Sequence, residues 1–225
     1  LETIIYSDIQ VDPPEHLVLE AVDFAKQEKI DVIIGFGGGS SMDVAKIIAL
    51  LAHPQQKQNL SEIYWVNQAK APRLPLILIP TTAGTGSEVT PISIVTTGAT
   101  TKMGVVSPIL YADVAILDAT FTQNLPAQIT AATGIDAMVH AIEAYTSKHK
   151  KNPYSDMLAK QALRLLNANL QRVLQNGHDL DARQNMLVGS MLAGQAFANA
   201  PVAAVHALAY PLGGHFHLSH GHSNA

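Results

Sequence analysis

The sequence contains no cysteine in its 225 residues, which excludes disulfide bonds and metal sites built on thiolates. It has no block of basic residues and a net charge of -4, so nucleic acid is not an expected partner. No apolar run approaches the ~20 residues of a membrane-spanning helix, and no cationic face favours a membrane surface. A metal here would have to be bound by histidine, aspartate, glutamate or water.

What the chain does have is a globular composition, with 48% apolar and 14% charged residues. Its first half alternates strand and helix patterns. Strands are predicted at 30–35, 74–80, 90–97, 102–106 and 114–117. Helices are predicted after Pro13-Pro14 and at 42–52, and the polar stretch 53–73 is interpreted as a surface connection. Strands that are apolar throughout and alternate with helices predict a parallel sheet covered on both faces.

Beyond about residue 125 the strand patterns end and helical periodicity takes over. Helices are expected at 135–147, 153–174 and 180–198. We therefore place a domain boundary between residues 126 and 127, with an α/β domain at 1–126 and an all-helical domain at 127–225. The sequence starts and stops in mid-pattern, so we expect it to be a fragment.

A glycine loop, Gly35-Phe36-Gly37-Gly38-Gly39-Ser40, lies between a predicted strand and a predicted helix. Glycines let the backbone approach a ligand closely, and the start of a helix offers N–H groups that suit a phosphate. Ser40 and Asp43 have the spacing of a capping box. The match to a dinucleotide fingerprint is partial, because no convincing acidic residue follows about 20 positions later. A turn that only joins strand to helix is the alternative.

A second polar loop, at residues 81–88, also follows a predicted buried strand. Loops at the carboxyl ends of parallel strands line ligand crevices, and small hydroxyl residues between glycines can bind phosphate or ribose. The alternative is an ordinary turn rich in serine and threonine. Two such loops in one chain strengthen the interpretation of both.

Asp136 and His140 lie four residues apart in a predicted helix, which puts both side chains on one face. His206 and His220 follow in a histidine-rich segment that also contains His215, His217 and His222. Three imidazoles and one carboxylate would suit Fe²⁺ or Zn²⁺. The alternatives are an exposed helix pair and a histidine loop that is solvated or binds metal adventitiously, because spacing does not show that the two pieces meet.

With these motifs the chain resembles the iron-containing (group III) alcohol dehydrogenase family. The matching stretches are GFGGGSSMDVAK at 35–46, IPTTAGTGSE at 79–88, ATGIDAMVHAIEAY at 132–145 and VHALAYPLGGHFHLSHGHSNA at 205–225. The resemblance extends over essentially the whole chain. It implies an α/β, Rossmann-like dinucleotide-binding domain followed by an all-α metal-binding domain, with segments of the family missing at both ends.

The resemblance also implies the roles of particular residues. It gives four metal ligands: Asp136, His140, His206 and His220. It places these residues around the cofactor: Gly37, Gly38, Gly39, Ser40, Asp43, Thr81, Thr82, Thr85, Ser87 and Lys102. For Lys102, the alternative is a solvated surface lysine.

One position departs from the family pattern. Many members have a second histidine four residues after the third metal ligand, proposed for the proton path, and this chain has Tyr210 there. A tyrosine hydroxyl can donate a hydrogen bond, but it is no base at neutral pH without a large pKa shift. His217 or His222 could replace the missing histidine.

The activity implied by the resemblance is hydride transfer between NAD or NADP and a small alcohol, aldehyde or ketone, with Fe²⁺ or Zn²⁺ as Lewis acid. A cytoplasmic homo-oligomer, a dimer, is expected, with neither nucleic acid nor membrane as partner. Two alternatives stay open. One is an enzyme related to glycerol dehydrogenase or dehydroquinate synthase on the same layout, and the other is an inactive fragment that binds metal or nucleotide.

Overall fold

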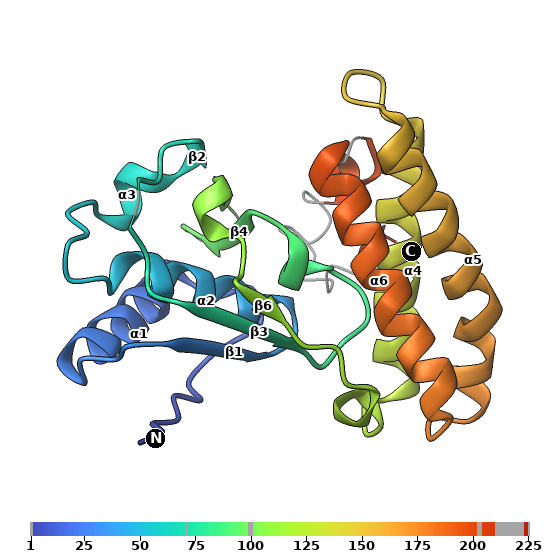
Figure 1. Ribbon diagram of the computed structural model, residues 1–225, viewed down its shortest axis with the longest axis horizontal. Coiled ribbons are helices and arrows are strands. Elements are labelled where there is room, and N and C mark those ends of the chain that lie inside the picture. Colours follow the sequence, from blue (N-terminus) through green and yellow to red (C-terminus); the bar gives the residue numbers. More distant parts are fainter. Residues whose placement is uncertain (1, 71, 99–100, 202–203, 210–222, 225) are drawn as a thin grey trace. The chain divides into compact units, whose positions relative to one another are not determined.

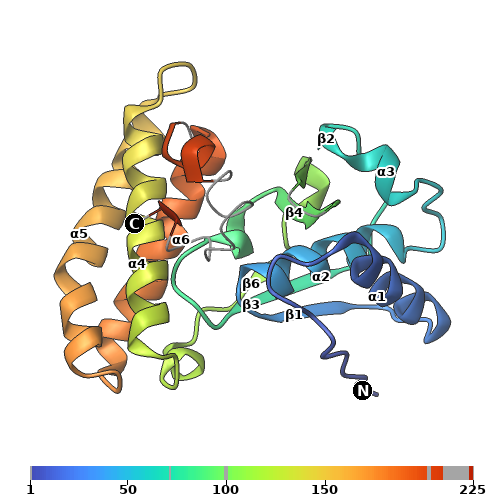
Figure 2. The same ribbon diagram turned by 180° about the vertical axis from the view of Figure 1, so that it is seen from behind.

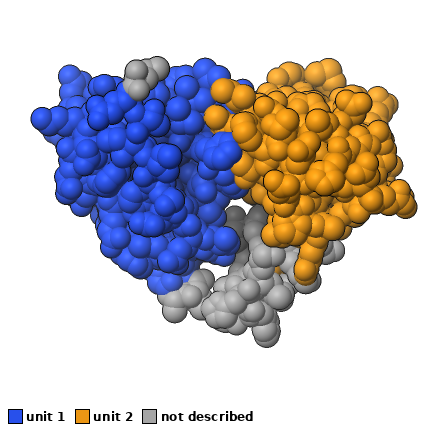
Figure 3. Space-filling view, turned by 90° about the horizontal axis from the view of Figure 1, so that it is seen from below, with its two compact units in different colours: residues 1–78, 91–115 blue, residues 79–90, 116–225 orange. Residues whose placement is uncertain are grey.

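A computed structural model describes residues 2–70, 72–98, 101–201, 204–209 and 223–224 (Figure 1). The chain folds into two compact units, coloured separately in Figure 3. Unit 1 comprises Leu1–Leu78 and Pro91–Ala115, and unit 2 comprises Ile79–Thr90 and Ile116–Ala225. The domain boundary at 126/127 stays a prediction, because compactness alone does not show which segments fold independently.

Unit 1 contains a sheet with the strand order β1-β3-β6, formed by β1 (Ile33–Gly37), β3 (Leu76–Pro80) and β6 (Val114–Ala115). Strands β3 and β6 are parallel, as predicted. Two helices, α1 (Glu15–Gln27) and α2 (Gly39–Leu51), pack on this sheet (Figures 1 and 2). Apolar residues of this sheet and of the two helices thus share a core, which includes Ala25, Ile33, Met42, Leu76 and Leu78.

The prediction of a sheet covered on both faces is wrong for β1 among the described residues. Ile33 joins the core under α1 and α2, but Ile34 and Phe36 are 57% and 53% exposed. Successive side chains of a strand point to opposite faces, so the described helices cover only one face of β1.

The prediction of an all-parallel sheet is also wrong for the strands at 90–97 and 102–106. They form β4 (Ile92–Thr96) and β5 (Lys102–Val106), which pair antiparallel from Ile92↔Val106 to Thr96↔Lys102. A parallel connection needs about a dozen residues, and the segment between these strands is far shorter. A two-residue strand, β2 (Trp65–Val66), pairs parallel with β5 and completes this second sheet.

The interpretation of residues 53–73 as a plain surface connection is wrong as well. The stretch contains α3 (Leu60–Ile63) in addition to β2, and a capping box of Asn59 and Glu62 starts this helix. Leu60 and Ile63 are 1% and 0% exposed and join the core formed by α1, α2 and the second sheet. Because polar residues surround Leu60 and Ile63 in the sequence, no apolar run indicates that they belong to the core.

Unit 2 is built on three long helices, α4 (Ala127–Thr146), α5 (Pro153–Gln175) and α6 (Leu180–Asn199), which confirms the all-helical second half. The side chains of Asn152 and Asp179 cap α5 and α6 by accepting from Ser155 N and Ala182 N. The predicted start of the first helix at 135 is wrong, because α4 already begins at Ala127 after Pro126. Small residues fill the buried faces: Ala137, Ala141, Ala159, Ala162, Ala193 and Ala196. None of the described helices is both long and apolar enough to cross a membrane.

Candidate metal centre

Helix α4 carries a buried face of polar side chains. Asp136, His140 and Glu143 follow one another at helical spacing and are only 1%, 4% and 3% exposed. The alternative of an exposed Asp136–His140 pair is therefore excluded. Burying carboxylates is unfavourable unless hydrogen bonds or cations compensate, so this face requires specific partners.

His206 is one of those partners, although it lies 66 residues beyond His140 in the sequence. It belongs to a helical segment at residues 204–209 and is 3% exposed. One ligand atom from each of Asp136, His140 and His206 lies within 4.8 Å of the other two. The fold thus brings together three of the four residues expected to bind metal.

The donor set fits a borderline divalent cation. His206 Nε2 lies 3.8 Å from Asp136 Oδ1. Two ligand atoms that are each about 2.0–2.2 Å from one ion are separated by at most about 4.4 Å, so this pair meets the limit. Two imidazoles and one carboxylate are ligands that Fe²⁺ and Zn²⁺ accept.

The two imidazole rings are held in place by their neighbours. They stack on each other with centroids 4.5 Å apart and an angle of 18° between the planes, and Phe197 of α6 lies 4.5 Å from the His140 ring. His140 Nδ1 lies 3.3 Å from the carbonyl oxygen of Gly84. If Nδ1 donates to that oxygen, Nε2 is the nitrogen that His140 presents to a metal.

Two residues of this cluster were missed by the sequence analysis. Glu143 Oε2 lies 2.5 Å from His206 Nδ1, and Glu143 Oε1 accepts from Val205 N at 2.7 Å. Asn224 Nδ2 donates to Asp136 Oδ1 at 2.6 Å and lies 3.3 Å from His206 Nε2. Glu143 could have been found from its spacing of seven residues from Asp136, whereas no local pattern marks Asn224.

His220 and Tyr210 lie outside the described residues, as do His215, His217 and His222. The fourth metal ligand and the proton path therefore stay predictions.

The glycine loop of unit 1 leads directly into a helix. Helix α2 begins at Gly39, and its N-cap, Gly38, has no side chain that could cap the first turn. Gly37 has φ +151°, and a Cβ atom there would meet Ser41 Oγ at 2.6 Å. The first N–H groups of any helix have no partner within the helix, so the start of this 13-residue helix suits a phosphate.

The interpretation of Ser40 and Asp43 as a capping box is wrong. The helix starts before Ser40, and Ser40 Oγ accepts from Asp12 N at 3.2 Å. Asp43 Oδ2 instead accepts from Ile94 N at 3.0 Å, which ties α2 to β4. A strand from 51 residues further along the chain supplies this donor, so short-range spacing could not predict it.

Lys102 is not a fully solvated lysine. Its side chain is 17% exposed, and its Nζ lies 2.6 Å from Asp12 Oδ1. Because Asp12 also donates its backbone N–H to Ser40, the structure brings Lys102 and Ser40 together around one aspartate near the start of α2.

The loop at residues 81–88 belongs to unit 2 and packs closely on its helices. Gly86 has φ +60°, and a Cβ atom there would lie 2.6 Å from Gly194 Cα on α6. A Cβ atom on Gly84 would lie 2.7 Å from Thr133 Cβ on α4. The four hydroxyl residues of the expected cofactor set are half-buried or buried: Thr81, Thr82, Thr85 and Ser87. The loop is therefore packed against α4 and α6, and its Gly84 carbonyl contacts His140, which is unlike an ordinary exposed turn.

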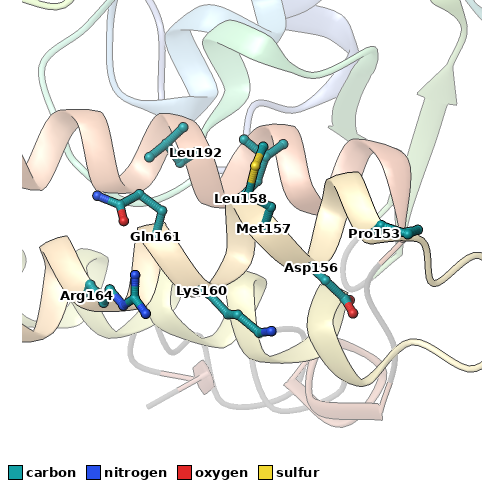
Figure 4. Close-up of a pocket in the computed structure, with 8 residues that line it drawn as sticks. All are labelled: Pro153, Asp156, Met157, Leu158, Lys160, Gln161, Arg164 and Leu192. Carbon is teal, nitrogen blue, oxygen red and sulfur yellow. The ribbon is translucent and has the colours of Figure 1, made fainter.

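A separate hollow of about 700 Å³ lies on α5 and α6 (Figure 4). Its lining is mixed in charge and apolar character: Pro153, Asp156, Met157, Leu158, Lys160, Gln161, Arg164 and Leu192. None of the candidate metal or cofactor residues is among these side chains, so the hollow is not part of the metal centre.

Comparison with known proteins supports the resemblance. Residues 1–119 match the family described as iron-containing alcohol dehydrogenase, and residues 130–225 match the C-terminal part of the Fe-containing alcohol dehydrogenase family. A long-chain-alcohol dehydrogenase of Geobacillus thermodenitrificans is 50% identical over 222 residues, which are 98% of this chain and 56% of the relative. An NAD-dependent methanol dehydrogenase of Bacillus methanolicus is 39% identical and matches over 100% of this chain and 58% of its own.

Among solved structures, a 1,3-propanediol oxidoreductase superposes with a TM-score of 0.93 at 37% identity over 98% of this chain and 57% of its own. The chain thus spans a little over half the length of the relatives it matches. Family matches to both halves, together with a buried Asp-His-His cluster on the expected residues, lead to one conclusion: the chain belongs to the iron-containing alcohol dehydrogenase family.

Proposed function

We propose that the full-length protein is a metal-dependent alcohol dehydrogenase that transfers a hydride between NAD or NADP and a small alcohol, aldehyde or ketone. The observation that carries the proposal is the buried cluster of Asp136, His140 and His206, whose donor atoms converge within 4.8 Å. Its relatives named as alcohol and methanol dehydrogenases support the same activity.

In this proposal Asp136, His140 and His206 hold the ion together with His220, and the ion is Fe²⁺ or Zn²⁺. When bound, the ion acts as a Lewis acid on the substrate oxygen. The protein's own contribution is rigidity: Phe197 packs against the ring of His140, and the carbonyl of Gly84 orients that ring. Fixed ligands hold a substrate in one orientation, which lowers the entropic part of the barrier.

In this proposal the two polar loops bind the cofactor. The N–H groups of Gly38, Gly39 and Ser40 would bind the pyrophosphate at the start of α2, with Lys102 close by and with Asp43 fixing α2 against β4. The hydroxyl residues of the second loop would contact the nicotinamide and ribose. Tyr210 would donate a hydrogen bond in the proton path. A homodimer and a cytoplasmic location complete the proposal, on the strength of the family resemblance.

The test is turnover and metal content of the purified full-length protein, with Asp136→Asn as the decisive variant and Asp156→Asn as its matched control. Both variants neutralise one carboxylate in unit 2, but Asp156 lies on α5, pairs with Lys151 and is not among the three residues of the cluster. We expect wild type and Asp156→Asn to bind about one metal ion per chain and to oxidise short-chain alcohols with formation of NADH or NADPH.

Asp136→Asn should lose both metal and activity, because a neutral amide replaces a charged ligand. Full activity in Asp136→Asn, or activity in protein stripped of metal, would contradict the proposal.

A further inference from the structure

Glu143 makes two hydrogen bonds to one short segment. Its Oε1 accepts from the backbone N–H of Val205, and its Oε2 lies 2.5 Å from Nδ1 of His206. The carboxyl group is 3% exposed and lies on the same helix face as Asp136 and His140. One side chain of α4 therefore fixes both the backbone and the ring of a residue from a distant part of the chain.

The contacts of the His206 ring show which nitrogen faces Asp136. When Glu143 is ionised its oxygens only accept hydrogen bonds, so the hydrogen between Glu143 Oε2 and His206 Nδ1 belongs to Nδ1. The other ring nitrogen, Nε2, lies 3.8 Å from Asp136 Oδ1 and 3.3 Å from Asn224 Nδ2. A neutral imidazole with its proton on Nδ1 has its lone pair on Nε2, which is the state that a metal ligand requires.

We propose that Glu143 is the positioning residue of the metal centre, which it prepares by keeping the Nε2 lone pair of His206 directed at the ion. The inference rests on the proposed metal site and adds a residue that works through a ligand. A carboxylate behind a metal-bound histidine fixes the ring tautomer and raises the basicity of the ligand, and losing such a partner typically lowers metal affinity about 10–100-fold.

Glu143→Gln separates this role from simple anchoring. Glutamine has nearly the same shape, but it offers one acceptor oxygen to two donors, Val205 N–H and His206 Nδ1–H. If the oxygen stays with Val205, the amide NH₂ faces Nδ1 and favours the tautomer with the proton on Nε2. That tautomer has no lone pair to give to a metal at Nε2.

The experiment measures the affinity of the metal-free, full-length protein for Co²⁺ by competition with a chelator, together with the visible spectrum of the bound Co²⁺. Asn169→Ala is the matched control, because Asn169 is also a buried polar residue of the helical unit, 3% exposed and bonded to the Leu165 carbonyl. The control should lower stability and leave the Co²⁺ affinity and spectrum unchanged.

We expect Glu143→Gln to weaken Co²⁺ binding by about 10–100-fold and to shift its spectrum, with the protein still folded. Equal affinity in Glu143→Gln and wild type would overturn the positioning role and leave the proposed metal site standing. Equal weakening in Asn169→Ala would also overturn it, because the loss would then follow stability. A wild type without Co²⁺ binding would overturn both the metal site and this inference.

Should Glu143→Gln not fold, Glu143→Asp decides in the same assay. Its carboxylate keeps the charge but is drawn back by one methylene from His206. Weakened Co²⁺ binding would support the proposal, and wild-type affinity would overturn it.

Discussion

The contact between Gly86 and Gly194 is expected to be intolerant of a single methyl group. Gly194 lies in α6, where alanine would normally stabilise the helix by about 1 kcal/mol. A Cβ atom there would lie 2.8 Å from Gly86 O and 2.9 Å from Gly86 Cα, both of them backbone atoms of the loop at 81–88. A side chain can relieve such a clash by changing its rotamer, but backbone atoms cannot, so the loop at 81–88 would have to shift.

Forcing an extra methyl into a packed interior costs about 1–3 kcal/mol, and the upper part of that range applies to rigid neighbours. After the gain in helix propensity is subtracted, Gly194→Ala should destabilise the protein by about 1–2 kcal/mol. Gly189→Ala is the comparison variant on the same helix, because its Cβ would meet side-chain atoms and no backbone, Leu166 Cγ at 2.9 Å and Cδ2 at 3.0 Å. Leu166 can change its rotamer where the backbone of Gly86 cannot, so we expect Gly189→Ala to destabilise the protein less than Gly194→Ala.

The assay is urea unfolding of the full-length protein, followed by circular dichroism, with the midpoint compared at equal slope. Gly194→Ala should unfold at lower urea than both wild type and Gly189→Ala. It should also weaken metal binding, since moving the loop carries the Gly84 carbonyl away from His140. If Gly194→Ala proves at least as stable as Gly189→Ala, the claim that the loop packs against the α6 backbone is wrong.

Two more predictions concern charged residues. Arg73 donates to both carboxylate oxygens of Asp113 and thereby holds the pKa of that carboxyl below its usual value. A carboxyl whose pKa is lowered by folding stabilises the fold above its unfolded pKa near 4, and this stabilisation is lost as the pH falls through the folded pKa. The free energies of unfolding of wild type and Asp113→Asn should therefore differ at neutral pH and converge at low pH. A difference that stays constant with pH would refute this linkage. Arg183, 4% exposed, donates to Gly177 O and Thr130 Oγ1, and burial lowers its pKa. Arg183→Met leaves these acceptors without their charged donor and should cost about 3 kcal/mol in urea unfolding, whereas a loss below about 1 kcal/mol would contradict the structural role.

The sequence predicted the features that depend on local periodicity. Helix α5 was expected at 153–174 and found at Pro153–Gln175, and α6 was expected at 180–198 and found at Leu180–Asn199. Helix α5 is amphipathic and repeats its apolar signal on every turn, and the side chains of Asn152 and Asp179 mark the starts of α5 and α6. Helix α3 has only four residues, about one turn, so its apolar residues do not repeat and no helix was predicted there.

In the candidate site, too, only the contacts within one helix could be predicted from sequence spacing. Asp136 and His140 share a helix, and their spacing alone predicts that they face the same way. The meeting of His206 with them depends on how two distant segments pack, and only the family resemblance suggested it. The partners of Glu143 and Asp43 are supplied across 62 and 51 residues, at distances where no sequence spacing carries information.

The most direct test of the metal site is the position of the ion in crystals of the full-length protein supplied with Zn²⁺, located by its anomalous scattering. We predict one strong peak within about 2.0–2.2 Å of an Asp136 oxygen and of Nε2 of both His140 and His206. An ion bound elsewhere, or histidines that face the ion through Nδ1, would contradict the assignment of this buried cluster as the metal site.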